Sequence, residues 1–366
     1  MSERSTSFQI PYIAWLDADG KPLSKDLPAV ASNRARMVEL FKTMLFTRVF
    51  DTKSIALQRT GKLGTYASCL GHEAAHVAIG AAMRPEDCLA PSYREYAAQF
   101  MRGVKPRDVL MYWGGDERGN DFSGPAHDFS WCVPISTQCL HAAGSALAFK
   151  LRKEPRVAVS ICGDGGSSKS DFYAAINAAG AWKLPYVGVI VNNQWAISVP
   201  RTMQTGAPTL AQKGLAGGLA CVQVDGNDLI AVLDVVEKAI TRARAGEGGS
   251  VIEAVTYRLG DHTTADDARR YRGEEEVKAA WKREPMIRMR NWLTAQGWWS
   301  EVEETAWNEE CGKQVDVEIN AYLESKVQPV EAMFDYLHAD MPADVAAQRA
   351  QAMAIDAARS AAAPRS

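Results

Sequence analysis

The sequence lacks the features that would direct it to a membrane, to nucleic acid or to an oxidising compartment. No apolar run in its 366 residues is long enough to span a bilayer, and residues 1–7 lack the apolar core of a signal peptide. The formal net charge of −3 includes no basic surplus for binding nucleic acid. The seven cysteines form no Cys-x-x-Cys pair, which is typical of reduced thiols. We therefore expect a globular cytoplasmic protein.

What is present is a regular alternation of apolar runs and helical patterns. Buried strands are predicted at 157–162, 186–191, 222–224 and 250–257, and helices at 32–59, 71–83, 138–150, 170–182, 227–245, 280–293 and 301–325. Continuous apolar strands that alternate with helices indicate an α/β fold, with a doubly wound, mainly parallel sheet flanked by helices. We expect a loosely structured N-terminal arm at 1–31, the α/β domain at 32–283 and a helical extension at 284–366.

The most informative motif is a Gly-rich turn combined with two consecutive asparagines. Gly163-Asp164-Gly165 comes directly after the run at 157–162, and Asn192-Asn193 comes after the run at 186–191. In a parallel βαβ unit both turns fall on the same edge of the sheet, where ligands bind. A carboxylate, an amide and the N–H groups of a helix that begins near Ser170 would therefore meet at this edge.

These groups suit a diphosphate that is bridged by a metal ion. Asp164 and Asn193 offer the hard oxygen ligands that Mg²⁺ prefers, and this ion usually shares its shell with phosphates. The glycines allow the backbone to approach an anion closely. Either half of the motif alone is equally compatible with an ordinary turn or strand end, so the interpretation depends on the two halves together.

Longer blocks around this motif resemble one family. The stretches 163–173 and 193–200 are similar to the alpha subunit of the thiamine diphosphate-dependent, decarboxylating component of 2-oxo acid dehydrogenase complexes. Further matching blocks are Leu70-Gly71-His72-Glu73-Ala74-Ala75, Pro91-Ser92-Tyr93-Arg94-Glu95, Val224-Asp225-Gly226-Asn227-Asp228, the stretch 256–267 and Tyr271-Arg272. The resemblance covers most of the chain, and it implies the diphosphate-binding type of thiamine diphosphate fold.

The resemblance implies two cofactors, thiamine diphosphate and Mg²⁺, and a role for each matching residue. The implied Mg²⁺ ligands are Asp164, Asn193 and the carbonyl of Trp195. The implied cofactor contacts are Tyr93, Arg94, Gly165 and Gly166 at the diphosphate, and backbone groups of Val133 and Ile135 at the aminopyrimidine. His262 would contact the cofactor and act as the catalytic residue. An imidazole can donate a hydrogen bond to a developing oxyanion, and its ordinary pKa suits proton transfer near neutrality.

The implied reaction is decarboxylation of a 2-oxo acid, followed by reductive acylation of the lipoyl domain of a dihydrolipoyl acyltransferase. The family takes an activating Glu from a separate beta chain, so we expect two alpha and two beta chains, with no activity from this chain alone. The resemblance favours pyruvate, while Asn193-Gln194-Trp195 and Gln296-Gly297-Trp298-Trp299 leave branched-chain 2-oxo acids open. A scaffold that binds the cofactor without catalysis is the non-enzymatic alternative.

Three other patterns have to be weighed against this interpretation. His72-Glu73-Ala74-Ala75-His76 has the zincin spacing, but no third ligand clearly follows, and helix-start and packing contacts are the alternative. Gly163-x-Gly165 lacks the third Gly of a dinucleotide fingerprint, because residue 168 is Ser168. His127 falls where the family often carries a His, yet the Arg and Met of that pattern are absent.

Overall fold

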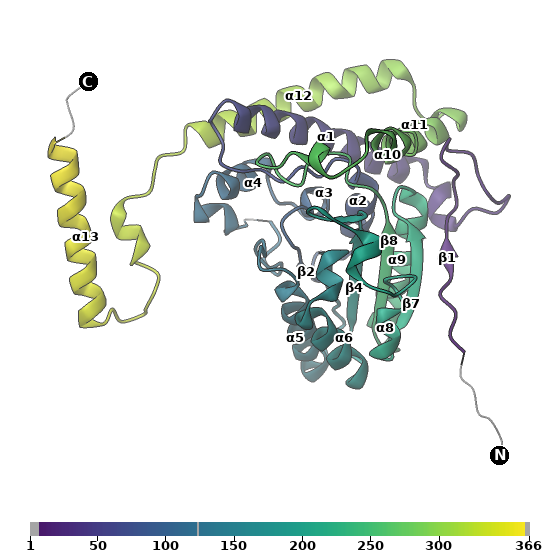
Figure 1. Cartoon of the computed structure of the whole chain (residues 1–366), viewed down its shortest axis with the longest axis horizontal. Coiled ribbons are helices and arrows are strands. Elements are labelled where there is room, and N and C mark those ends of the chain that lie inside the picture. The colour runs from purple at the N-terminus through teal and green to yellow at the C-terminus, as the bar shows by residue number, and fades with distance from the viewer. Residues whose placement is uncertain (1–6, 123, 363–366) are drawn as a thin grey trace. The chain divides into compact units, whose positions relative to one another are not determined.

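The computed structural model describes residues 7–122 and 124–362. The chain divides after Tyr322 into two compact units, and the larger one contains the main sheet (Figure 1). In the described part of the chain, no helix is both long enough and apolar enough to cross a membrane. The domain boundaries expected after residues 31 and 283 stay predictions.

The larger unit is built on a six-stranded sheet in which every neighbouring pair is parallel. The strand order is β1-β7-β8-β4-β3-β2. The strands are β1 (Tyr12–Ile13), β2 (Cys88–Ala90), β3 (Ala158–Gly163), β4 (Tyr186–Asn192), β7 (Ala220–Asp225) and β8 (Ser250–Val255). The predicted parallel α/β fold is confirmed.

Helices cover both faces of this sheet (Figure 1). One face packs on α1 (Arg34–Arg59), α2 (Glu73–Ala82), α9 (Leu229–Arg244) and α11 (Pro285–Ala295), and the other on α5 (Thr137–Arg152) and α6 (Ser170–Ala181). In β4, Val187, Val189 and Val191 belong to the first core, whereas Tyr186 and Ile190 belong to the second. A strand that is buried on both sides is apolar throughout, which explains the unbroken run in the sequence.

The remaining elements connect and extend these layers. Further helices are α3 (Tyr96–Met101), α4 (Pro106–Trp113), α7 (Arg201–Gln204), α8 (Lys213–Ala216), α10 (Glu274–Trp281) and α12 (Glu301–Leu323), and β5 (Trp195–Ala196) forms a hairpin with β6 (Val199–Pro200). Turns of 3₁₀ helix lie at Ala29–Ser32, Glu117–Asn120, Gly165–Ser168, Ala268–Arg270 and Val330–Met333. The smaller unit contains α13 (Ala343–Ala362), whose Arg349 pairs with Asp335 at 3.3 Å.

Two segments differ from the predictions. The N-terminal arm is less loose than expected, because β1 joins the sheet edge and Asp228 accepts hydrogen bonds from the N–H groups of Trp15 and Leu16, both at 2.7 Å. The single helix predicted at 280–293 is wrong. Pro285 occupies the first turn of α11 and Glu284 caps it, so α10 ends at Trp281 and a new helix begins.

The register of the sheet places both predicted motifs at one edge. Gly163, the last residue of β3, pairs with Val191, and Asn192, the last residue of β4, pairs with Val255 at the end of β8. The residues that follow these three strands therefore emerge side by side at the carboxyl edge, where α/β sheets bind ligands.

Candidate active site

A cavity of about 830 Å³ lies at this carboxyl edge. Every residue predicted to bind a cofactor or metal lines it: Tyr93, Arg94, Val133, Ile135, Asp164, Gly165, Gly166, Asn193, Trp195 and His262. Tyr93 and His262 are 169 positions apart in the sequence. The fold therefore assembles the whole predicted set around one space, which has the size of a small-molecule site.

The Gly-rich turn after β3 forms a wall of the cavity where side chains would not fit. A Cβ at Gly165 would lie 2.6 Å from the Cβ of Ala196, and one at Gly166 would lie 2.7 Å from the Ser136 hydroxyl. That hydroxyl donates a hydrogen bond to the Gly166 carbonyl at 2.7 Å. The two glycines thus keep bare backbone at the cavity surface, where an anion can approach it.

Asp164 places a buried carboxylate beside this turn. Burial raises the pKa of Asp164 above its ordinary value. Gln204, the last residue of α7, donates from Nε2 to Oδ2 of Asp164 at 2.5 Å, and the backbone N–H of Asn193 also bonds to this carboxyl group. A buried carboxylate whose partners are amides is stabilised further by a cation.

The other two predicted metal ligands are Asn193, in the turn after β4, and Trp195, the first residue of β5. Asn193 Oδ1 accepts a hydrogen bond from the N–H of Trp195 at 3.2 Å, and the Trp195 carbonyl accepts one from Arg258 Nη1 at 3.2 Å. Gln194 (φ 75°) and Ile197 (φ 55°) have left-handed backbone conformations here. Such conformations are uncommon in residues other than glycine and concentrate at functional sites.

Two guanidinium groups fix the tautomer of His262. Nδ1 of His262 lies 3.3 Å from Arg94 Nη2 and 3.2 Å from Arg258 Nη1. Guanidinium groups only donate hydrogen bonds, so Nδ1 is the acceptor and the proton of the neutral ring is on Nε2. Nε2 lies 3.5 Å from the Tyr93 hydroxyl. The ring therefore carries its N–H donor on the side of Tyr93, and both side chains line the cavity.

The expectation that His262 has a pKa near neutrality is wrong. Burial, with the positive charges of Arg94 and Arg258, lowers the pKa of His262 to about 3. At physiological pH the ring is thus a neutral hydrogen-bond donor and not a proton carrier. Burial, with the charges of Arg94 and Arg272, also lowers the pKa of Arg258, to about 10.

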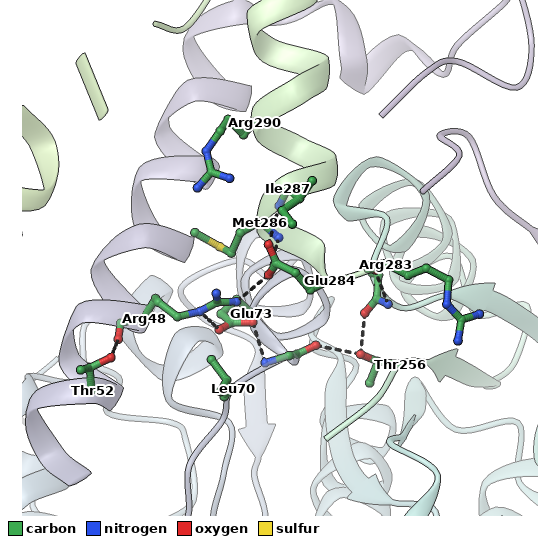
Figure 2. A network of polar contacts seen from close by, with 12 residues as sticks. Arg48, Thr52, Leu70, Glu73, Thr256, Arg283, Glu284, Met286, Ile287 and Arg290 are labelled. Atoms are coloured by element: carbon green, nitrogen blue, oxygen red, sulfur yellow. Dashed lines mark hydrogen bonds and ion pairs between the residues drawn. The ribbon is translucent and has the colours of Figure 1, made fainter. Parts of the chain in front are cut away.

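Glu73 of the zincin-like motif belongs to a network of ion pairs (Figure 2). Glu73 accepts hydrogen bonds from Arg48 Nε at 2.6 Å and from the N–H of Gly71 at 2.9 Å, and Arg48 also pairs with Glu284 at 2.8 Å. The carboxylate of Glu73 therefore closes an ion-pair network between α1, α2 and α11. Among the residues that the structure describes, no three His, Cys, Asp or Glu side chains are grouped to hold a metal ion.

Three other residues have positions in the structure that the sequence motifs do not reveal. His127 is exposed and is not one of the described residues that line the cavity. The motifs give Arg258 no role, although its position after β8, at the same edge as Asp164, is a signal in the sequence. No motif marks Gln204, which lies 40 positions from Asp164.

Comparison with known proteins identifies the family. The model of the family described as "Dehydrogenase E1 component" matches residues 41–331. The chain is 39% identical over 349 residues to the pyruvate dehydrogenase E1 component subunit alpha of Staphylococcus epidermidis, and the match covers 95% of this chain and 94% of that protein. The protein of the same name from Staphylococcus aureus is 38% identical over equal shares. The resemblance seen in the sequence is confirmed: the chain belongs to the dehydrogenase E1 component family.

Proposed function

We propose that the chain is the alpha subunit of a thiamine diphosphate-dependent 2-oxo acid dehydrogenase that acts on pyruvate in the cytoplasm. The observation that supports this most is the gathering of all the predicted cofactor residues, from Tyr93 to His262, around one cavity. The names of the relatives favour pyruvate over branched-chain 2-oxo acids.

The residues present fit Mg²⁺ and a diphosphate. Asp164, the side chain of Asn193 and the carbonyl of Trp195 are hard oxygen donors that lie together. One carboxylate leaves most of an octahedral shell to phosphate and water, which is how proteins usually hold Mg²⁺. Arg94 is buried beside them, and a guanidinium can donate parallel hydrogen bonds to phosphate oxygens. Gly165 adds backbone that an anion can reach.

His262 is proposed to stabilise negative charge without moving a proton. When bound, thiamine diphosphate supplies the electron sink for decarboxylation. Nε2–H of His262 would donate to the keto oxygen of the substrate as that oxygen gains negative charge. A pKa of about 3 keeps the ring neutral for this role. The bonds from Arg94 and Arg258 to Nδ1 hold the ring in the required tautomer.

The chain is proposed to work with a beta chain, two copies of each, and to pass the acyl group to a lipoyl domain of the dihydrolipoyl acyltransferase. Val133 and Ile135 line the cavity and are 49% and 43% exposed. Exposed apolar side chains at a binding site suit a partner that covers them. The beta chain would complete the pocket and supply the activating Glu that the family resemblance implies.

A steady-state assay of the reconstituted pair with pyruvate and with 3-methyl-2-oxobutanoate tests this proposal. We expect a higher kcat/KM for pyruvate and no turnover by the alpha chain alone. Turnover without a partner, or failure of thiamine diphosphate and Mg²⁺ to bind to the pair, would contradict the proposal. A non-catalytic scaffold would bind the cofactor and show no turnover with either acid.

A further inference from the structure

The histidine pair of the zincin-like motif has no role in the proposed reaction, although both rings are buried. His72 is 1% exposed and His76 is 0% exposed, and the rings meet edge to face with centroids 5.3 Å apart. The turn that carries His72 is held firmly: the N–H of Gly71 donates to Glu73, and the Gly71 carbonyl accepts from the hydroxyl of Thr256 at 2.7 Å (Figure 2). His72 therefore has a fixed backbone position.

All four ring nitrogens of this pair lack a hydrogen-bond partner among the described residues. Burial lowers the pKa of His72 well below its ordinary value, with further lowering from His76, Arg94 and Arg258. Burial, helped by the charge of Arg94, also lowers the pKa of His76, to about 3. Both rings are thus neutral, and each has one donor and one acceptor nitrogen. Because a buried polar group without a partner costs about 1–3 kcal/mol, a partner from outside the chain would be stabilising.

His72 is the member of the pair that reaches the cavity. In the part of the chain that the structure describes, His72 lines the cavity together with Arg94 and Asp164, and His76 does not. The charges that act on His72 from the protein are the cations Arg94 and Arg258. They disfavour a metal cation at this ring and favour an anion. A phosphate oxygen is an acceptor that a neutral imidazole N–H can bind.

We propose that His72 donates a hydrogen bond to the diphosphate of the bound cofactor, as a phosphate contact additional to Arg94 and the Gly165 turn. The inference rests on the proposed function, which supplies the diphosphate. His76 packs its ring edge to face against His72 but makes no contact with the diphosphate in this proposal. His72 thus has a binding role that needs no zinc.

Binding of thiamine diphosphate with Mg²⁺ to the reconstituted alpha–beta complex, followed by intrinsic fluorescence, tests the contact. His72→Leu should raise the Kd about tenfold, which corresponds to loss of one hydrogen bond. His76→Leu is the matched control, because His76 is equally buried and equally without partners but lies outside the cavity lining. Its Kd should stay within about twofold of wild type. An unchanged Kd in His72→Leu, or an equal rise in both variants, would overturn the inference.

If the complex with His72→Leu does not assemble, two conservative variants test whether His72 contacts the diphosphate. The amide nitrogen of Gln replaces Nε2 of the ring, and that of Asn replaces Nδ1. A single donor contact therefore predicts that His72→Gln and His72→Asn differ in Kd by about tenfold, with the better one close to wild type. Equal Kd values for the two would refute the contact. If the wild-type complex itself fails to bind thiamine diphosphate, the proposed function fails before any variant is compared.

Discussion

The turn before α2 joins two buried polar clusters in which arginine has opposite environments. In the paired cluster, formed by Arg48, Glu73 and Glu284, each carboxylate faces a guanidinium (Figure 2). Burial alone would lower the pKa of Arg48, but the two carboxylates outweigh it and raise that pKa. This cluster is complete within the chain.

In the cavity cluster, formed by Arg94, Arg258 and His262, the guanidinium groups meet a neutral ring and carbonyl oxygens. Burial lowers the pKa of Arg258 to about 10, and the charge of Arg94 adds to this. Buried cations without carboxylate partners are costly, and they are typical of sites that await an anion. The paired cluster therefore stabilises the fold. The buried cations of the cavity cluster reduce stability, and they favour the binding of an anion.

The largest effect is expected from removing the ring of the cavity cluster. His262→Ala should lower kcat of the reconstituted complex by about 10²–10⁴-fold, because a positioned donor to the reacting oxygen is lost. The melting temperature should change little, since no paired charge is broken. His141→Ala is the control: His141 is exposed, stacks on Phe129 and lies outside the cavity lining. Unchanged kcat in His262→Ala would contradict the role of His262 as a donor to the reacting oxygen.

Breaking the paired cluster should have the opposite effect, a large loss of stability with little change in kcat. Arg48→Met leaves two buried carboxylates without their partner, so we expect a loss of about 3–5 kcal/mol in the free energy of unfolding. The double variant Arg48→Met/Glu73→Gln should lose less than the sum of the single changes, because Glu73 contacts Arg48 directly. Urea titration of the single and double variants measures these losses. A large drop in kcat of correctly folded Arg48→Met would show that the two clusters are not separable in this way.

Stabilisation by an added ligand should depend on the cavity and not on the paired cluster. The expected effect is smaller than the two above. Thiamine diphosphate with Mg²⁺ at 100 times its Kd should stabilise the wild-type complex by about 2.7 kcal/mol. Arg48→Met should keep this gain, because its cavity is intact. Asp164→Asn should lose most of it, because the amide keeps the shape of the carboxylate but not the charge that holds Mg²⁺. Thermal unfolding with and without ligand measures the gain, and an equal gain in all three proteins would remove Asp164 from the metal site.

Much of the architecture was predictable because burial on both faces leaves a clear mark in the sequence. β3 and β4 are apolar along almost their whole length, and the glycines and asparagines that follow them mark the carboxyl edge. The break before Pro285 was also visible in principle, since proline favours the first turn of a helix. The apolar spacing that continues through residues 280–293 concealed it.

The electrostatics of the site were not predictable from local sequence. Arg94 lies 168 positions from His262, and only the fold brings their side chains within 3.3 Å. The ordinary pKa of an imidazole was therefore the only expectation available, and burial with two guanidinium groups overrides it. Gln204 was invisible for the same reason, because its contact with Asp164 depends on where α7 ends.

The smallest effect concerns pH and tests the neutrality of His262 directly. Its pKa falls from an ordinary 6.5 to about 3 in the folded chain. Between these values the unfolded chain binds a proton at this position and the folded chain does not, so the free energy of unfolding declines as the pH falls.

In His262→Gln this contribution is absent, while His72, His76 and the paired cluster titrate as before. The stability of wild type relative to His262→Gln should therefore decrease from pH 7 to pH 5, by at most about 1.4 kcal/mol per pH unit. A constant difference over that range in urea titrations would mean that the folded ring takes up its proton normally. The two arginines would then not fix the tautomer on which the oxyanion role depends.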